Sequence, residues 1–143
     1  MKLHFVQLVV VLAAGLMLST APNAQAGPGV KITVAGIKAP QGFMMIALHD
    51  EKGWSAAPLA RVRLPVTGAS FTTVLAAPAQ GRYGVKLFHD VNGDGKMETN
   101  IVGFPTEPFG FSNNAPIRLG PPSFADAAFD IGPSSALQVI TLR

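Results

Sequence analysis

The chain has 143 residues, no cysteine and a formal net charge of +3. This length has room for one domain, and the lack of cysteine excludes disulfides, thiol catalysis, iron–sulfur clusters and cysteine-ligated zinc. The few basic residues are scattered, for instance Lys31, Arg61 and Lys86, whereas nucleic-acid binding needs a dense basic patch, so we expect no nucleic-acid partner.

The first 26 residues have the three parts of a secretory signal peptide. Lys2 precedes an apolar run over residues 5–18, and the small-residue triplet Ala-Gln-Ala occupies positions 24–26; this order is typical of cleaved signals. The apolar run is shorter than the roughly 20 residues that span a bilayer, and without cysteine the chain is no lipoprotein. We therefore expect cleavage after Ala26, export to the periplasm or the cell exterior, and no stable membrane anchor.

Short apolar runs separated by Gly and Pro turns fill the rest of the chain. Such spacing predicts an all-β sandwich or barrel, and no stretch has a long helical period. We predict one domain over residues 27–143, an antiparallel Greek-key β-sandwich of about seven strands with one long ordered loop. Short helices are expected only near residues 54–57 and 123–128. The expected strands are residues 30–37, 43–49, 59–66, 70–76, 82–89, 127–131 and 137–142.

The expected long loop covers residues 90–126. Loops of this length are uncommon inside a compact domain and are usually functional or disordered. Disordered segments carry few aromatic residues, and this loop contains several, so we expect it to be ordered and packed. The residues that support this expectation are Ile101, Phe104, Phe109, Phe111 and Phe124.

The loop opens with a pattern that indicates a calcium site. Calcium takes six to eight oxygen ligands, and oxygen-bearing side chains at alternate positions of a Gly-containing loop can surround one ion. The predicted ligands are the side chains of Asp90, Asn92, Asp94 and Glu98 and the backbone carbonyl of Lys96.

This calcium pattern departs from that of an EF-hand. An EF-hand has a bidentate glutamate at its twelfth position, and here that position is Ile101; Glu98 is the substitute, with Asn100 in reserve. The alternative is a Gly-rich hairpin turn whose Asp and Asn side chains bond their own backbone.

Two expected strands end in a His-Asp pair, His49-Asp50 and His89-Asp90. Two histidines with carboxylates suggest a zinc or copper site. However, neighbouring residues on a strand point to opposite faces, which argues against convergence of each pair. A structural role is the simpler interpretation, and the sequence leaves the function of both histidines open.

No residues form a recognisable catalytic centre. The G-x-S-x-G nucleophile elbow is missing, and Ser112 lies instead in Gly-Phe-Ser-Asn-Asn. Glu107 lies near the acids of the 90–98 segment, and paired carboxylates can cleave glycosides, but calcium binding explains most of these acids better. We therefore predict that the chain is not an enzyme.

Three sequence blocks resemble a known family. They are Phe88-His89-Asp90-x-Asn92-Gly93-Asp94-Gly95-Lys96, then residues 103–114 (GFPTEPFGFSNN), then residues 120–129 (GPPSFADAAF). The chain resembles domain-of-unknown-function family 2141, small exported bacterial proteins, from Val30 to Leu142. The resemblance implies a prealbumin-like or carboxypeptidase-regulatory-like β-sandwich and implies no activity. That family often has Asp where this chain has Glu98.

Two functions follow as hypotheses. The first is a calcium-stabilised binding or structural module of the cell envelope, with envelope or extracellular components as partners. The second is a small-ligand carrier or hydrolase in which the aromatic long loop forms the edge of a pocket, because ligand pockets are mostly apolar with a few polar groups. Trp54, Phe104, Phe109 and Phe111 are the candidates for that edge. A cavity beneath the loop favours the second hypothesis, and a flat convex surface favours the first.

Overall fold

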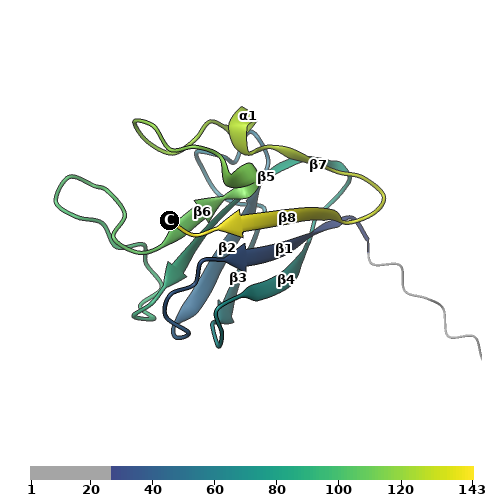
Figure 1. Cartoon of the computed structure of the whole chain (residues 1–143). Helices are drawn as coiled ribbons and strands as arrows, with labels where there is room; N and C mark the ends of the chain where they lie inside the picture. The colour runs from purple at the N-terminus through teal and green to yellow at the C-terminus, as the bar shows by residue number, and fades with distance from the viewer. Residues whose placement is uncertain (1–26) are drawn as a thin grey trace, which may run out of the picture.

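The computed structural model describes residues 27–143. The expected signal peptide, residues 1–26, lies outside the described residues. Two β-sheets pack face to face (Figure 1). The three-stranded sheet has the order β4 (Phe71–Ala76), β1 (Gly29–Ala35), β8 (Ala136–Thr141). The second sheet has the order β3 (Ala60–Pro65), β2 (Phe43–His49), β5 (Gly81–Asp90), β6 (Phe109–Phe111), and β7 (Phe129–Ile131) also pairs with β5.

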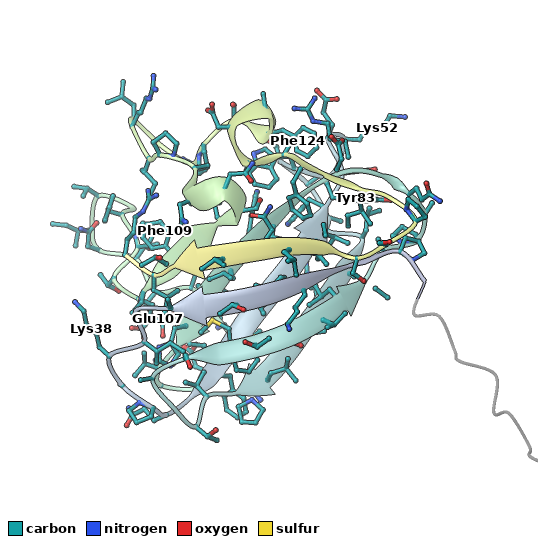
Figure 2. The ribbon with its side chains drawn as sticks, turned by 45° about the vertical axis from the view of Figure 1, so that its right-hand side comes forward. Lys38, Lys52, Tyr83, Glu107, Phe109 and Phe124 are labelled. Atoms are coloured by element: carbon teal, nitrogen blue, oxygen red, sulfur yellow. The ribbon has the colours of Figure 1, made fainter. Side chains whose placement is uncertain are left out.

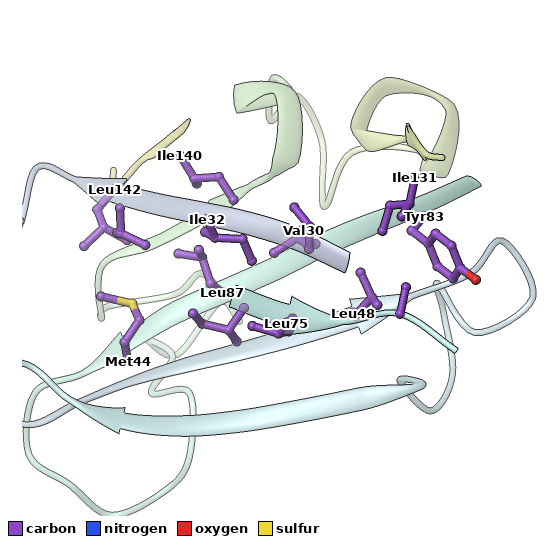
Figure 3. Close-up of a cluster of buried hydrophobic side chains, with 14 of the residues drawn as sticks. Val30, Ile32, Met44, Leu48, Leu75, Tyr83, Leu87, Ile131, Ile140 and Leu142 are labelled. Atoms are coloured by element: carbon purple, nitrogen blue, oxygen red, sulfur yellow. The ribbon is translucent and has the colours of Figure 1, made fainter. Parts of the chain in front are cut away.

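The core lies between the sheets and follows from the two-residue period of the strands. In β2, Met44, Ile46 and Leu48 are at most 2% exposed, because alternate residues point to the same face. The matching residues of β1, β5 and β8 meet them from the other strands (Figure 3). Full burial of one such side chain contributes about 1.5–3 kcal/mol. Alternation therefore also fixes which side chains face outward from each sheet.

The predicted all-β sandwich is confirmed. Five of the six pairings between named strands are antiparallel, and β1 and β8 pair in parallel. The expectation of purely antiparallel sheets is therefore wrong at this one pairing. Parallel neighbours need a long crossover connection, and here the rest of the domain provides it between the first and the last strand.

The segment 90–126 contains regular structure that the sequence interpretation left as loop. Strand β6, the 3₁₀ helix η1 (Ser112–Asn114) and the start of α1 (Phe124–Ala127) lie in it. The expected packing holds for Phe109, which is buried, but is wrong for Ile101, which is fully exposed, and for Phe104, which is half exposed. None of the helices within residues 27–143 is long and apolar enough to cross a membrane.

Candidate functional site

A groove of about 750 Å³ lies on the outer face of the five-stranded sheet. Its floor consists of the residues of β2, β3, β5 and β6 that point away from the core. Two loops cover it, residues 95–107 between β5 and β6 and residues 115–122 between η1 and α1. Both loops project from the same end of the sandwich (Figure 1). The groove is therefore concave and lies beneath the aromatic long loop.

The strand register arranges the floor in two rows that run across the sheet. The first row is Arg61, Ala47, Lys86 and Phe111, in neighbouring strands from β3 to β6. The second row is Met45, Phe88 and Phe109, and it continues on β3 at Arg63, which lies outside the groove with its guanidinium over the Phe43 ring. Arg61 thus lies on the β3 side of the floor, the aromatic residues lie toward β6, and Lys86 lies between them on β5.

Ala47 lies between two cations. Arg61 pairs with it from β3 and Lys86 from β5, and side chains directly opposite one another have Cβ atoms about 4.5–5.5 Å apart. The small Ala47 side chain leaves space between the two long ones. Among the residues that line the groove there is no aspartate or glutamate. The electrostatics at Ala47 therefore favour an anion.

Lys86 is held in place by Trp54. Its ammonium group lies 4.3 Å from the indole ring centroid and donates a hydrogen bond to the carbonyl oxygen of Trp54. Burial lowers the pKa of Lys86 from its ordinary value, because a low-dielectric site disfavours the charged form. An anion in the groove would offset this cost.

His49 also lines the groove, whose other basic residues are Arg61, Lys86 and Arg118. Its Nδ1 donates to the carbonyl oxygen of Gly53 at 2.8 Å, and its ring packs edge-on against Trp54. Burial lowers the pKa of His49 most, and Lys86 and Arg61 lower it further by repulsion. Burial, which has the largest effect, and the two cations therefore all disfavour the charged form of the imidazole.

Trp54 also supports the second covering loop. Its indole Nε1 donates to the carbonyl oxygen of Pro122 at 2.9 Å, and its ring packs against Phe111 and Phe124. Gly84 lies beneath the ring, where a Cβ atom would come within 2.7 Å of Trp54 Cζ3. The missing side chain at Gly84 thus makes room for the indole that connects the sheet to the loop.

The predicted calcium ligands lie in one loop around Asp90. Asp90 is fully buried, and its carboxylate accepts backbone N–H groups from Gly93, Asp94 and Gly95 at 2.8–3.1 Å. These bonds are the ones expected of the alternative, a Gly-rich turn whose acid bonds its own backbone.

The other predicted ligands also bond within the loop. Asn92 Oδ1 accepts from Asp94 N, Asp94 Oδ1 accepts from Lys96 N, and Asn92 Nδ2 donates to Glu98. Within residues 27–143, no three His, Asp or Glu side chains form a group that could hold a metal ion. The arrangement of carboxylates does not fit a metal centre as it stands, and calcium binding stays a prediction.

Glu107 has a role that the sequence interpretation missed. It is 6% exposed, and its two carboxylate oxygens accept the backbone N–H groups of Val91 and Glu98 at 2.9 and 3.3 Å. It therefore fixes the start of the first covering loop. The sequence feature that could have indicated a buried, structural acid is that Glu107 stands alone between Pro105 and Pro108 in an otherwise apolar stretch.

The two histidines do not form a joint site. Register and alternation put His89 on the core side of β5, beside Met44, whereas His49 lines the outer groove. His89 Nε2 bonds the carbonyl oxygen of Gln41 at 2.6 Å. Each ring therefore binds a turn carbonyl on its own face of the sheet.

Comparison with known proteins identifies the family. A family model described as "uncharacterized protein conserved in bacteria" (DUF2141) matches residues 32–138. Neither the curated proteins nor the solved structures contain a match. The matched residues run from β1 into β8 and include both sheets and both covering loops. The chain therefore belongs to this family of uncharacterized bacterial proteins, as its three sequence blocks indicated.

Proposed function

We propose that this chain is an exported module that binds a small amphipathic anion in the groove. The apolar part of the ligand lies along Met45, Phe88 and Phe109, and its anionic group lies over Ala47 between Arg61 and Lys86. The observation that carries the proposal is the register, which sets a small residue between two cations on an apolar floor. Ligand sites are typically concave and apolar with a few polar groups that orient the ligand.

The lining of the groove favours binding over hydrolysis. It contains one histidine, His49, and no serine, threonine, cysteine or carboxylate. Nucleophilic catalysis needs a nucleophile within hydrogen-bond reach of its base. A carrier or sensor needs no nucleophile and no base. Of the two hypotheses that place a ligand in a pocket, carrier and hydrolase, we therefore favour the carrier.

Export rests on the N-terminal sequence pattern alone. Mass spectrometry of the protein from its native envelope should show Gly27 at the N-terminus, and an intact Met1 would contradict export. Calcium binding by the 90–98 segment is a separate proposal. It is tested by comparing melting temperatures in the presence of calcium and of a chelator.

The ligand proposal is tested by fluorescence titration of residues 27–143 with 1-anilinonaphthalene-8-sulfonate, an aromatic anion, followed by displacement with dodecanoate or dodecanol. Dodecanoate should displace the probe at lower concentration than dodecanol. Arg61→Met should weaken dodecanoate binding about tenfold, equivalent to 1.4 kcal/mol, and leave dodecanol nearly unchanged.

The matched control is Arg82→Met, because Arg82 is exposed on β5 and does not line the groove. It should bind dodecanoate as the unmodified chain does. Equal affinities for the acid and the alcohol, or equal losses in both variants, would contradict an anion seat at Ala47.

A further inference from the structure

The two covering loops expose large aliphatic side chains at their tips. Ile101 and Leu119 are fully exposed, Val102 is 80% exposed and Phe104 is 54% exposed. Scattered apolar residues are normal on protein surfaces, but here four lie on two loops that project together from one end of the sandwich (Figure 1). Val102, Phe104 and Leu119 also line the groove, but Ile101 lies outside its lining, so a groove ligand does not explain the exposure of Ile101.

The tips themselves carry charge of one sign, whereas the exposed acids Asp94 and Glu98 lie at the base of the first loop. Residues 99–106 and 115–122 contain no acidic residue, and Arg118 is their single charged residue. A second cleft beside the loops is lined by Lys38, Arg118 and Arg143. Figure 2 shows Lys38 at this end of the molecule, near Glu107 and Phe109.

Glu107 is the one acid that lines this second cleft. It is buried, and both of its oxygens already accept backbone N–H groups. Its charge is therefore directed into the protein. The exposed end of the sandwich presents apolar tips with cations behind them.

We propose that these loop tips insert reversibly into an anionic lipid surface. Apolar side chains on separate projecting loops suit the acyl–headgroup boundary of a bilayer, and the cations behind them suit anionic headgroups, which attract Lys and Arg near the surface. A flat protein partner would need a continuous apolar face, which two separate tips do not provide. This contact is peripheral and differs from a membrane-spanning anchor. It does not depend on the groove ligand.

The test is flotation of residues 27–143 with lipid vesicles. This form contains every named element and both core clusters, and it lacks the apolar run at positions 5–18, which would bind lipid by itself. Vesicles of phosphatidylcholine mixed with phosphatidylglycerol should carry the protein upward, and vesicles of phosphatidylcholine alone should carry much less of it.

The deciding variant is the double substitution I101S/L119S, which should lower partition into anionic vesicles at least about tenfold, since two aliphatic side chains no longer leave water. Its matched control is L137S/V139S. Leu137 and Val139 are also exposed, at 72% and 59%, but lie on strand β8 and not on either covering loop. The control should float like the unmodified chain. Arg118→Glu should also lose binding to anionic vesicles.

Three results would overturn the proposal. One is absence of flotation with any vesicle. Another is equal flotation of the tip variant and its control. The third is a dimer, detected by analytical sedimentation, that the I101S/L119S substitution abolishes. In that case the loop tips would bind a second copy of the chain. Arg61→Met separates this contact from the groove ligand, because it should float normally; its failure to float would assign lipid binding to the groove.

Discussion

The carboxylate of Glu107 accepts the backbone N–H of Val91 at 2.9 Å, although sixteen positions separate the two residues. The other carboxylate oxygen accepts the N–H of Glu98. One buried side chain thus connects both ends of the segment that leads into the first covering loop. The loop closes on itself through the bond from Thr106 N to Glu98 O and the Thr99–Pro105 bridge, and Glu107 ties the base of this closed loop to the end of β5.

Glu107→Gln should destabilise the fold, because the amide nitrogen is a donor and cannot accept the N–H that the second oxygen now binds. An unsatisfied buried group costs about 1–3 kcal/mol. Urea denaturation measures the free energy of unfolding. Glu51→Gln is the control, since Glu51 is exposed. Equal urea midpoints for both variants would show that Glu107 does not hold the loop.

Gly84→Ala should displace the Trp54 ring. The new Cβ would lie 2.7 Å from Trp54 Cζ3, and overpacking of this kind typically costs about 1–3 kcal/mol. Because the same indole bonds Pro122 and contacts Lys86, the variant should also bind the anionic probe more weakly. Thermal melting and probe titration check the two effects.

The control for this substitution is Gly132→Ala, where an added Cβ meets nothing within 4 Å. It should melt within about 2 °C of the unmodified chain, since surface substitutions usually change stability by no more than about 0.5 kcal/mol. If both alanine variants melt alike, the indole is free to move and does not fix the covering loop.

The stability of the fold should fall as the pH drops below about 6.5, the ordinary pKa of histidine. Burial, Lys86 and Arg61 lower the pKa of His49 in the folded state. Below pH 6.5 the unfolded chain therefore takes up a proton that folded His49 resists, which favours unfolding. The loss is complete only below the lowered pKa of the folded state.

His49→Asn is the comparison, because its side-chain amide can still donate to the carbonyl of Gly53 and does not titrate. The variant should lose less stability between pH 7 and 5 than the unmodified chain, in urea titrations at each pH. In addition, NMR titration should show the pKa of His49 rising when dodecanoate binds, since the anion offsets the two cations. Parallel pH profiles for both proteins would exclude His49 as the source.

Sequence alone predicted the strands that have one buried face. Strand β2 runs over Phe43–His49, as the apolar run between two turn segments indicated. Strand β6 was not predicted, because a stretch of three residues centred on a glycine is too short to show a strand-like hydrophobic pattern. Its position in the sheet is set by its backbone pairing with β5. The short helix α1 was expected near its observed position, where the side chain of Ser123 caps it.

The candidate site could not be predicted in the same way. Arg61, Ala47 and Lys86 are far apart in the chain, and only the strand order β3-β2-β5 aligns them. Likewise, nothing near Trp54 in the sequence indicates that Pro122 accepts its indole N–H. The aromatic residues of the 90–126 segment did point to the right region, since Phe104, Phe109 and Phe111 line the groove.

Calcium binding by the 90–98 segment is the sequence prediction with the sharpest test. The side chains of Asp94 and Glu98 and the amide of Asn92 lie at the surface, and each of them now bonds within the loop. A calcium ion would have to replace the bond between Asn92 and Glu98. In return, it would neutralise the repulsion among the loop carboxylates. Extracellular modules often bind calcium at about 10⁻⁴–10⁻³ M, so the experiment needs millimolar calcium.

Melting curves of residues 27–143 should be recorded with calcium and with chelator, for the unmodified chain and for Asp94→Ala. An ion that binds the folded state alone stabilises it by about 2.7 kcal/mol at a hundredfold excess over Kd, so calcium should raise the melting temperature of the unmodified chain. The rise should vanish in Asp94→Ala, because that substitution removes one ligand and leaves buried Asp90 in place. Magnesium is the control ion. It should raise the melting temperature less than calcium, because its smaller, octahedral coordination shell suits this loop less. If calcium and chelator give the same curve for the unmodified chain, Asp90 is the acceptor at the centre of a Gly-rich turn and the loop holds no ion.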